Sequence, residues 1–387
     1  MVHIPALSSS EAVALAASVS RPALLSRGIR YTSSIPRFAL ARLLGKRFPV
    51  RALPLQLVTL PPMAAQPGWE LLRVRLAGIC GSDLALLYGK NSPALSPFFS
   101  FPAILGHEVL AETGGVRVAI NPLLTVAESH PDQLSREILP GHSSEMLGFS
   151  ADVPGGWADL MVAPVHRLHP VPDSVSDACA VLAEPLAVVV RAAQQLQSHW
   201  PAELLVIGAG TIGLLLIKAL RLLGYGGPIH VVARRPRQAE LAQLFGANAV
   251  HASTVAAQEA LGARPYRGLL GSVAWRGGFS AVVEASGSPA GLQQASWAVH
   301  EGGRVVLVGA PGLALHDLSP YWYREVQLVG TYVYSPAQFG LALELLTQAP
   351  DLEQLTGPRF PLEAWPQAIG AALKLKGSKV LFQPQPL

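Results

Sequence analysis

Three residues of types that bind zinc lie in the first third of the chain, namely Cys80, His107 and Glu108. Thiolate, imidazole and carboxylate are the ligands that zinc accepts, and a catalytic zinc site uses three of them with one position open. Each residue also has an ordinary explanation, because a free cysteine is usually a small buried hydrophobe and a His-Glu pair is usually polar surface. Residue type alone therefore leaves both alternatives open.

A further carboxylate, Glu184, interrupts the otherwise apolar run over residues 179–190. Burying a carboxylate without a partner is costly, so Glu184 needs a metal or a hydrogen-bonded network beside it. The neighbouring Pro185 predicts a fixed bend here rather than a regular helix.

A glycine-rich stretch follows a short apolar run at residues 204–207 and precedes an apolar, helix-prone segment. Its residues are Gly208, Ala209, Gly210, Thr211, Ile212 and Gly213. The first glycine permits a tight turn, the second lets backbone approach a pyrophosphate, and the third lets helix and strand pack closely. The helix N-terminus then offers free N–H groups to the phosphates. We expect a dinucleotide site here; the alternative is an ordinary strand-to-helix turn.

The choice of dinucleotide is read at the end of the next expected strand, where Ala233 is followed by Arg234 and Arg235. An acidic residue at this place binds the ribose 2′-hydroxyl of NAD, whereas an arginine accommodates the 2′-phosphate of NADP. Ala233 fills the carboxylate position, and the two arginines offer forked donors suited to a phosphate. We therefore expect a preference for NADP, with NAD possible; the alternative is that both arginines only face solvent.

Elements that position these residues fall into two patterns. Strands and helices alternate after residue 203, which predicts a parallel, doubly wound sheet with right-handed crossovers. Strands are expected at 204–207, 229–233, 281–285 and 304–308, and helices at 238–245 and 291–299. In the part of the chain before residue 203, the stretch 30–62 favours short strands and turns. Further strands are expected there at 57–60, 69–76, 117–121 and 160–165. The alternation stops near residue 330, and a helix is expected at 337–347.

Length and composition limit the number of domains, the class of protein and the kinds of partner. The 387 residues are too many for one ordinary core, so two domains are expected. Half of the residues are hydrophobic and 14% are charged, which is typical of a well-buried enzyme. No uncharged apolar run reaches the length of about 18 residues that spans a bilayer, so no membrane partner is expected. Basic residues are not interleaved with stacking aromatics, so no nucleic-acid partner is expected either.

The net charge of +4 is scattered, except that residues 21–51 carry basic residues and no acidic ones. This excess favours anionic ligands or is simply a solvated face. The chain has two cysteines, which argues against a disulfide framework and favours a cytoplasmic location. Residues 1–28 contain no identifiable chemistry and are expected to be a surface helix or a disordered lead rather than a signal peptide.

Four motifs in this order resemble the zinc-containing medium-chain dehydrogenase/reductase superfamily, which is alcohol dehydrogenase-like. They are Gly78-Ile79-Cys80-Gly81-Ser82-Asp83, Gly106-His107-Glu108, Glu184-Pro185 and the glycine turn at 208–213. The Glu-Pro pair places the likeness nearest the polyol and threonine dehydrogenase branch. The resemblance implies an α/β protein with a GroES-like, mainly β catalytic domain and a Rossmann domain. We expect the catalytic domain at 1–186 and 333–387, and the Rossmann domain at 187–332.

The same resemblance implies roles for individual residues. Cys80 and His107 would be zinc ligands, with Glu108 or Glu184 completing the set. Ser82 would take the proton from the substrate alcohol, and Asp83 would lie behind the site. Zinc would polarise the alcohol or carbonyl oxygen while the nicotinamide exchanges a hydride with it. The full expected cofactor set is Gly208, Gly210, Thr211, Ile212, Gly213, Ala233, Arg234, Arg235, Ser286 and Gly309.

The chain also departs from the family. The region about 121–156 has no cysteine, so the four-cysteine lobe that holds a structural zinc in many members is absent. His130 and His142 there are expected to be exposed and not ligands. Ala85 stands where some relatives have a relay histidine. Two alternatives therefore stay open: a metal-free NADPH-dependent reductase of the same fold, and a catalytically idle NADPH-binding regulatory protein.

The substrate is expected to be a small-molecule alcohol or its carbonyl counterpart, bulky and apolar in character. Residues 88–101 and Trp157 are expected near the metal, where Phe98, Phe99, Phe101 and Trp157 either line an apolar cleft or belong to the core. The family implies a homodimer or homotetramer. Substrate identity, direction and stereochemistry do not follow from the sequence.

Overall fold

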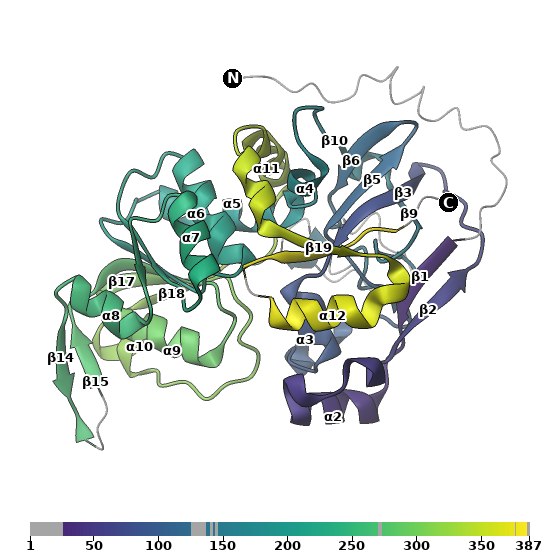
Figure 1. Ribbon diagram of the computed structural model, residues 1–387. Helices are drawn as coiled ribbons and strands as arrows, with labels where there is room; N and C mark the ends of the chain where they lie inside the picture. The colour runs from purple at the N-terminus through teal and green to yellow at the C-terminus, as the bar shows by residue number, and fades with distance from the viewer. Residues whose placement is uncertain are drawn as a thin grey trace.

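The structure is a computed structural model that describes residues 26–124, 137–139, 142–143, 146–269, 273–375 and 377–384. It has a β-rich domain and an α/β domain side by side, and the C-terminal part of the chain crosses from one to the other (Figure 1). Most of the N-terminal lead expected at 1–28 lies outside the described residues. Its last three residues, 26–28, already belong to the first strand.

A seven-stranded sheet forms the frame of the β-rich domain, in the order β10-β6-β5-β3-β20-β19 with β9 paired to β3. Its strands are β3 (Trp69–Gly78), β5 (Val109–Thr113), β6 (Val116–Ile120), β9 (Leu160–Pro164), β10 (Leu168–Pro170), β19 (Thr356–Phe360) and β20 (Lys379–Phe382). A three-stranded sheet, β2-β1-β4, adjoins it, with β1 (Ser26–Tyr31), β2 (Leu55–Leu60) and β4 (Ala103–Ile104). Because β20 pairs antiparallel with β3, both ends of the chain build this domain, as the GroES-like prediction implies.

Helices and short segments of the β-rich domain complete it. They are α2 (Ile35–Leu44), η1 (Gly45–Arg47), η2 (Val50–Ala52), α3 (Gly81–Leu87), η3 (Pro93–Phe98), β7 (Glu137–Leu139), β8 (His142–Ser143), η4 (Val165–Arg167), η7 (Leu362–Ala364) and α12 (Trp365–Lys374). The prediction of only strands and turns over 30–62 was wrong at α2. Pro36 stands in its first turn, where proline is tolerated, and the alanines, leucines and arginines that follow are good helix formers.

The α/β domain contains six parallel strands in the order β13-β12-β11-β16-β17-β18. They are β11 (Leu204–Ile207), β12 (Ile229–Val232), β13 (Ala249–His251), β16 (Phe279–Glu284), β17 (Val299–Leu307) and β18 (Gln327–Gly330). The helices are α4 (Asp177–Ala180), α5 (Ala183–Gln197), α6 (Thr211–Leu222), α7 (Pro236–Leu244), α8 (Thr254–Ala260), α9 (Pro289–Ala298), α10 (Ser319–Tyr323) and α11 (Pro336–Thr347), followed by η6 (Pro350–Leu355). The predicted doubly wound parallel sheet is confirmed, with β13 and β18 as additional strands.

A two-stranded hairpin that the sequence did not predict, β14 (Arg264–Arg267) and β15 (Val273–Arg276), projects from the α/β domain (Figure 1). It lies between α8 and β16 in the chain and is an addition to the alternation of strands and helices. The domain limits at 186 and 332 remain a prediction.

The bend expected at Pro185 lies a few residues earlier. α4 ends at Ala180 and α5 begins at Ala183, so the chain turns through Val181 and Leu182. Pro185 sits in the first turn of α5, where its missing N–H has no helical partner to lose. Glu184 is therefore a first-turn residue of a regular helix.

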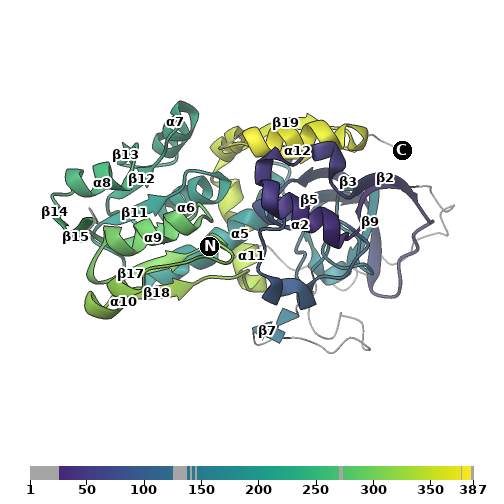
Figure 2. The ribbon, with the colours of Figure 1, turned by 90° about the horizontal axis from the view of Figure 1, so that it is seen from below.

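Helix α5 joins the two domains. Its Leu186 and Val190 share one hydrophobic cluster with Leu76 and Leu381 of the seven-stranded sheet and with Val206 of the parallel sheet. From below, α5 and α11 lie between the two domains (Figure 2). Because Glu184 lies in the first turn of this helix, packing of the shared core sets where that carboxylate lies relative to the β-rich domain.

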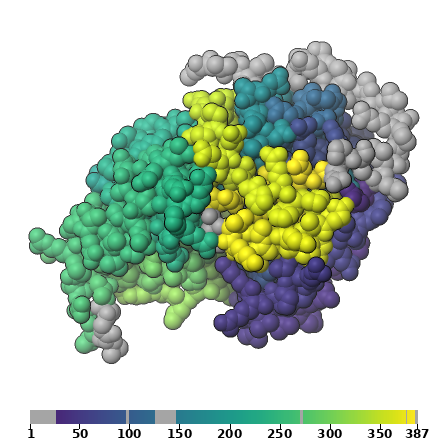
Figure 3. Space-filling model, in the orientation of Figure 1, coloured from purple at the N-terminus to yellow at the C-terminus, as the bar shows by residue number. Residues whose placement is uncertain are grey.

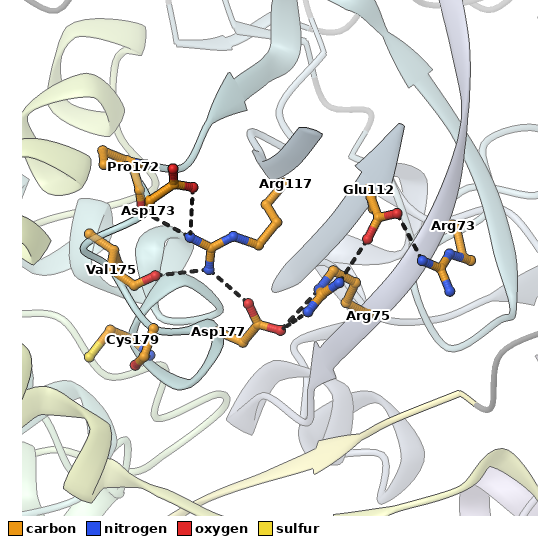
Figure 4. Close-up of polar contacts among 10 residues, drawn as sticks. Arg73, Arg75, Glu112, Arg117, Pro172, Asp173, Val175, Asp177 and Cys179 are labelled. Carbon is orange, nitrogen blue, oxygen red and sulfur yellow. Dashed lines mark hydrogen bonds and ion pairs between the residues drawn. The ribbon is translucent and has the colours of Figure 1, made fainter. Parts of the chain in front are cut away.

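A chain of ion pairs ties the seven-stranded sheet to α4, just ahead of α5 (Figure 4). Arg75 bridges Glu112 (2.7 Å) and Asp177 (2.6 Å), and Arg117 Nη1 reaches the other Asp177 oxygen at 2.8 Å. Burial raises the pKa of Asp177, but hydrogen bonds from Arg117 and Arg75 outweigh it and hold that pKa below its ordinary value. Hydrogen bonds from Arg73 and Arg75 lower the pKa of Glu112 in the same way.

This network predicts acid sensitivity. A carboxyl with a lowered folded-state pKa contributes stability above its unfolded pKa of about 3.9 and loses it as the pH falls through the folded value. We expect Asp177→Asn to lower the free energy of unfolding by about 1–3 kcal/mol at neutral pH, because it removes charged hydrogen bonds. The deficit should shrink below about pH 4, where the wild-type carboxyl is protonated too.

Urea unfolding of both proteins across this pH range measures the effect. Asp173→Asn is the matched control, since its fully exposed carboxyl lies 3.9 Å from the Arg117 guanidinium. Equal stability loss in both variants, or a deficit at Asp177 that does not depend on pH, would contradict the prediction.

Candidate active site

Three residues selected for zinc meet at one place in the structure. The candidate ligand atoms of Cys80, His107 and Glu108 all lie within 4.8 Å of one another. Cys80 stands at the N-cap of α3, and His107 and Glu108 come directly before β5. His107 and Glu108 are buried and Cys80 is partly exposed. A sulfur, a nitrogen and a carboxylate oxygen gathered at a partly open position match the donor set of a catalytic zinc site.

An unpaired polar atom in this cluster also fits a metal. Among the residues that the structure describes, Glu108 Oε2 is buried without a hydrogen-bond partner. Leaving a buried polar atom unsatisfied is costly, so such atoms call for an explanation, and a bound ion is one. The soft thiolate among the donors favours zinc over magnesium or calcium, which prefer oxygen ligands.

Asp83 lies behind Cys80 and His107 and interacts with both. It is fully buried, its Oδ2 accepts a hydrogen bond from the Cys80 backbone N–H at 2.8 Å, and its Oδ1 lies 3.5 Å from His107 Nδ1. Burial lowers the pKa of His107, but the Asp83 carboxylate and the Cys80 sulfur outweigh it and raise that pKa well above its usual value. Asp83 therefore holds both the start of α3 and the imidazole in position.

Lys379, which the sequence analysis did not select, is paired with Glu108. Its Nζ lies 2.5 Å from Glu108 Oε1, and both side chains are buried. Burial lowers the pKa of Lys379, but the Glu108 charge outweighs it and raises that pKa. On the other side, a Cβ at Gly78 would lie 2.0 Å from Glu108 Oε2, so only glycine leaves room for this carboxylate. Glu108 is thus held with one oxygen on lysine and the other unpartnered.

Glu184 lies outside the tight cluster but interacts with it electrostatically. It is buried, and Tyr334 donates a hydrogen bond to its Oε1 at 3.2 Å. Burial raises the pKa of Glu184 to about 7, and the Glu108 charge adds to the rise while His107 and Lys379 oppose it. The network partner that the sequence required is therefore present. The structure groups Glu108, rather than Glu184, with Cys80 and His107.

Ser82 lies on the exposed side of the site. Its Oγ is 3.4 Å from His107 Nε2. The hydroxyl can exchange a proton with a group bound at the cluster and pass it to solvent.

Of the aromatic residues near the site, one belongs to the hydrophobic core and others lie beside the His107 ring. Trp157 is fully buried and donates to the Gly78 carbonyl at 3.1 Å, so it is a core residue and not a cleft wall. Phe99 and Phe101 are half-buried and stacked, and Phe149 bridges Phe99 to the His107 ring at a 5.0 Å centroid distance. The side chain of Phe98 lies outside the described residues.

The glycine turn has the geometry of a phosphate-binding loop. Gly208 follows β11 with a φ of +106°, which other residues rarely adopt, and a Cβ at Gly213 would lie 1.9 Å from the Gly208 carbonyl oxygen. Gly210 precedes α6, no side chain caps that helix, and open space lies where a Gly210 side chain would stand. The N–H groups of Thr211, Ile212 and Gly213 are therefore available to an anion.

A buried glutamate at the end of β16 shapes the opposite wall of this turn. Glu284 accepts hydrogen bonds from the backbone N–H of Ser286 (2.9 Å) and Gly287 (3.2 Å), as well as one from the Ser286 hydroxyl. The Ser286 backbone lies close to Gly208, because a Cβ added at Gly208 would be 2.7 Å from the Ser286 nitrogen. Gly309 packs against Gly287, where a Cβ would be 2.3 Å away. The structure thus brings Ser286 to the glycine turn and packs Gly309 against Gly287, the residue after Ser286.

The two arginines after β12 differ in their surroundings. Ala233 is buried and donates its N–H to the His251 carbonyl, so its side chain faces the core side of the strand end. Arg235 Nη1 donates to the Lys374 carbonyl of α12 at 2.9 Å, which links the α/β domain to the other domain. Arg234 is exposed and makes no such contact within the described residues.

Known proteins match along most of the chain. Residues 66–173 match the alcohol dehydrogenase GroES-like domain family and residues 211–348 the zinc-binding dehydrogenase family. Glucose 1-dehydrogenase of Thermoproteus tenax is 31% identical over 271 residues, which are 66% of this chain and 72% of that protein. Sorbitol dehydrogenase of Bacillus subtilis is 26% identical over 346 residues, 85% of this chain and 94% of that one.

The chain belongs to the zinc-containing medium-chain dehydrogenase/reductase superfamily. Its relatives place it in the polyol branch, so it is an alcohol dehydrogenase-like oxidoreductase. The fold agrees with a solved structure of a putative zinc-binding dehydrogenase from Sinorhizobium meliloti bound to NADP. That structure has a TM-score of 0.70 at 21% identity, and the match covers 93% of this chain and all of that one. No helix among the described residues is long and apolar enough to cross a membrane.

The region about 121–156, where the resemblance implied a structural zinc in many members, contains no cysteine in this chain. Of the residues there, His130 lies outside the described part of the chain and so does the side chain of His142, so the expectation that neither is a ligand stays a prediction. Ala85, at the relay position, lies inside α3 and is half-buried. A proton route through Ser82 needs no group at that position.

Three site residues escaped the sequence analysis: Lys379, Tyr334 and Glu284. Lys379 and Glu284 each border an apolar strand, and an ionisable residue beside an apolar run was the signal that selected Glu184. The same rule would have found both. Tyr334 had no such signal, because its hydroxyl meets Glu184 only through the packing of the segment before α11 on α5.

Proposed function

We propose that this dehydrogenase is a zinc-dependent, NADP-preferring enzyme that transfers a hydride between NADP(H) and an alcohol or polyol, or the corresponding aldehyde or ketone. The observation that carries the proposal is the grouping of Cys80, His107 and Glu108, in which the buried Glu108 Oε2 has no other partner. The glycine turn supports the dinucleotide part of the proposal, because its free N–H groups and open space suit a pyrophosphate.

In this proposal Cys80, His107 and Glu108 hold the metal. Glu184 is not a ligand and keeps its hydrogen bond with Tyr334. Zinc held there supplies Lewis-acid polarisation of the substrate oxygen. Lys379 and Asp83 keep the ligands in place, and buried surroundings exclude water from the His107 side. Ser82 Oγ accepts the proton of an alcohol and releases it to solvent. Residues 208–213, with Ser286 and Gly309, hold the nicotinamide dinucleotide.

Arg234 supports the preference for NADP. It is exposed at the end of β12, beside the position where a carboxylate would bind a ribose hydroxyl, and its side chain makes no hydrogen bond or ion pair within the described residues. Arg235 is engaged by Lys374, so we assign the 2′-phosphate chiefly to Arg234. We also propose that the chain divides at about 186 and 332, and that it works as a homodimer or homotetramer.

Turnover and metal content together test the function. Protein purified without chelator should contain about one zinc per chain and should reduce or oxidise members of a panel of alcohols, polyols and aldehydes with NADP(H). Turnover that survives complete zinc removal would favour the metal-free reductase. NADPH binding without turnover on any member of the panel, with zinc present, would favour the idle regulatory protein.

Cofactor preference gives a separate prediction. The variant Ala233→Asp/Arg234→Ala should move kcat/KM from NADPH towards NADH by about tenfold or more, because it removes a phosphate donor and adds a carboxylate for the ribose hydroxyl. Steady-state kinetics with both cofactors measure the ratio. Arg235→Ala is the control, and we expect it to change the ratio less. An unchanged ratio in the double variant would refute the assignment of Arg234.

A further inference from the structure

Helix α2 presents an unusual outer surface for a helix in an enzyme. Ile35, Ala39 and Leu43 recur every four residues, so they lie on one face of the helix, and Leu40 and Leu44 lie next to them. Ile35 is 85% exposed and Leu43 80% exposed, and Leu40 and Leu44 are exposed as well. We call these five residues the outer stripe of α2.

The opposite face of α2 is firmly seated, so this exposure does not come from a loose segment. Ala41 is buried in the same hydrophobic cluster as Phe48 and Leu53, which follow the helix. Arg42 Nη1 donates to the Gly89 carbonyl at 2.8 Å, just beyond the end of α3. α2 is therefore a fixed part of the β-rich domain.

Positive charge borders the outer stripe. At about 100° per residue, Arg37 falls beside Leu44, and Lys46 and Arg47 follow the end of the helix. All three are exposed, and none has an ion pair or hydrogen bond within the described ranges. The sequence has no acidic residue between Glu11 and Glu70. The neighbouring chain therefore provides no charge that would neutralise this border.

The position of α2 leaves the outer stripe accessible. The helix lies at the edge of the β-rich domain, nearest the viewer when the molecule is seen from below (Figure 2). In the space-filling view the segment that contains it forms the lower edge of this domain, beneath the C-terminal residues (Figure 3).

We propose that α2 docks on an anionic lipid surface, with the outer stripe among the headgroups and upper acyl chains and Arg37, Lys46 and Arg47 on lipid phosphates. An apolar stripe bordered by basic residues is the pattern of a helix that lies in a membrane interface. Anionic lipids attract such basic residues, and the attraction weakens with salt. A helix in the interface needs no spanning run, so the proposal departs from the expectation of no membrane partner, which rested on spanning segments alone. It does not depend on the proposed function.

Vesicle flotation of the full chain tests the proposal. We expect binding to vesicles of phosphatidylcholine with phosphatidylglycerol, little binding to phosphatidylcholine alone, and loss of binding at high salt. Ile35→Ser/Leu43→Ser should lower the partition coefficient by about tenfold or more, because two exposed apolar side chains no longer enter the interface. Lys46→Glu/Arg47→Glu should weaken binding and remove most of its salt dependence.

Leu313→Ser/Leu315→Ser is the matched control, since it removes two exposed leucines from the α/β domain. It should bind vesicles as the wild type does, and thermal melting shows whether all variants are folded. Equal binding by the Ile35→Ser/Leu43→Ser variant and the wild type would overturn the proposal, and so would no binding by the wild type. Self-association of the wild type that this variant abolishes, without vesicle binding, would instead assign the stripe to a second copy of the chain.

Discussion

Replacing Cys80 with alanine is expected to abolish stoichiometric zinc binding and to lower kcat/KM for alcohol oxidation by about a thousandfold. The sulfur is one of three donor atoms within 4.8 Å of one another, and a site left with His107 and Glu108 has too few ligands for tight binding. Several kcal/mol of transition-state stabilisation come from Lewis-acid polarisation, and each 1.36 kcal/mol is about tenfold in rate. Metal analysis of the purified protein and steady-state kinetics measure both effects.

Cys179→Ala is the matched control, because it removes the only other cysteine of the chain. Cys179 is buried on α4, with its sulfur 3.5 Å from the Pro350 carbonyl oxygen and 3.9 Å from that of Ala349. This variant should keep its zinc and its activity. If Cys80→Ala retained one zinc per chain, the ligand assignment would be wrong.

The second large effect concerns stability. Lys379→Met should lower the free energy of unfolding of the zinc-free protein by about 3–5 kcal/mol, because it leaves the Glu108 carboxylate buried without its cation. Both partners are almost completely buried, so water cannot replace the lost partner. The midpoint of urea unfolding, measured in chelator, reports the change.

Two further variants show whether the buried pair is responsible. Lys218→Met breaks a pair of similar length, 2.7 Å from Lys218 Nζ to Asp351 Oδ2, but both partners are partly exposed, so the cost should be about 1 kcal/mol or less. Adding Glu108→Gln to Lys379→Met should restore part of the stability, because it removes the unpaired charge. A cost at Lys379 no greater than that at Lys218 would contradict the argument.

Local patterns in the sequence predicted those parts of the molecule whose chemistry is local. The turn at 208–213 is such a part, because strand, glycine spacing and helix lie within a few residues, and each glycine answers a steric need of its neighbours. The parallel sheet followed from the same alternation of strands and helices. Boundaries differed by a few residues, as between the expected strand at 281–285 and β16 at Phe279–Glu284.

Prediction was weaker where a segment has mixed signals. The stretch at 30–62 contains prolines at several places, which obscured α2, although proline in a first turn is compatible with a helix. The bend near Glu184 was expected at Pro185 but occurs at Val181 and Leu182, for the same reason. In both places the effect of proline depended on its position in the turn.

The sequence by itself determined the residue types of the site: a thiolate, an imidazole and carboxylates for a metal, and a glycine turn for a dinucleotide. Only the tertiary structure decided which carboxylate joins Cys80 and His107, because Glu108 and Glu184 are equally good ligands until packing places them. It also decided that Lys379, 271 residues from Glu108, is the cation beside it. β20 pairs with β3 at the edge of the site, and no local pattern records a contact made by strand pairing across the whole chain.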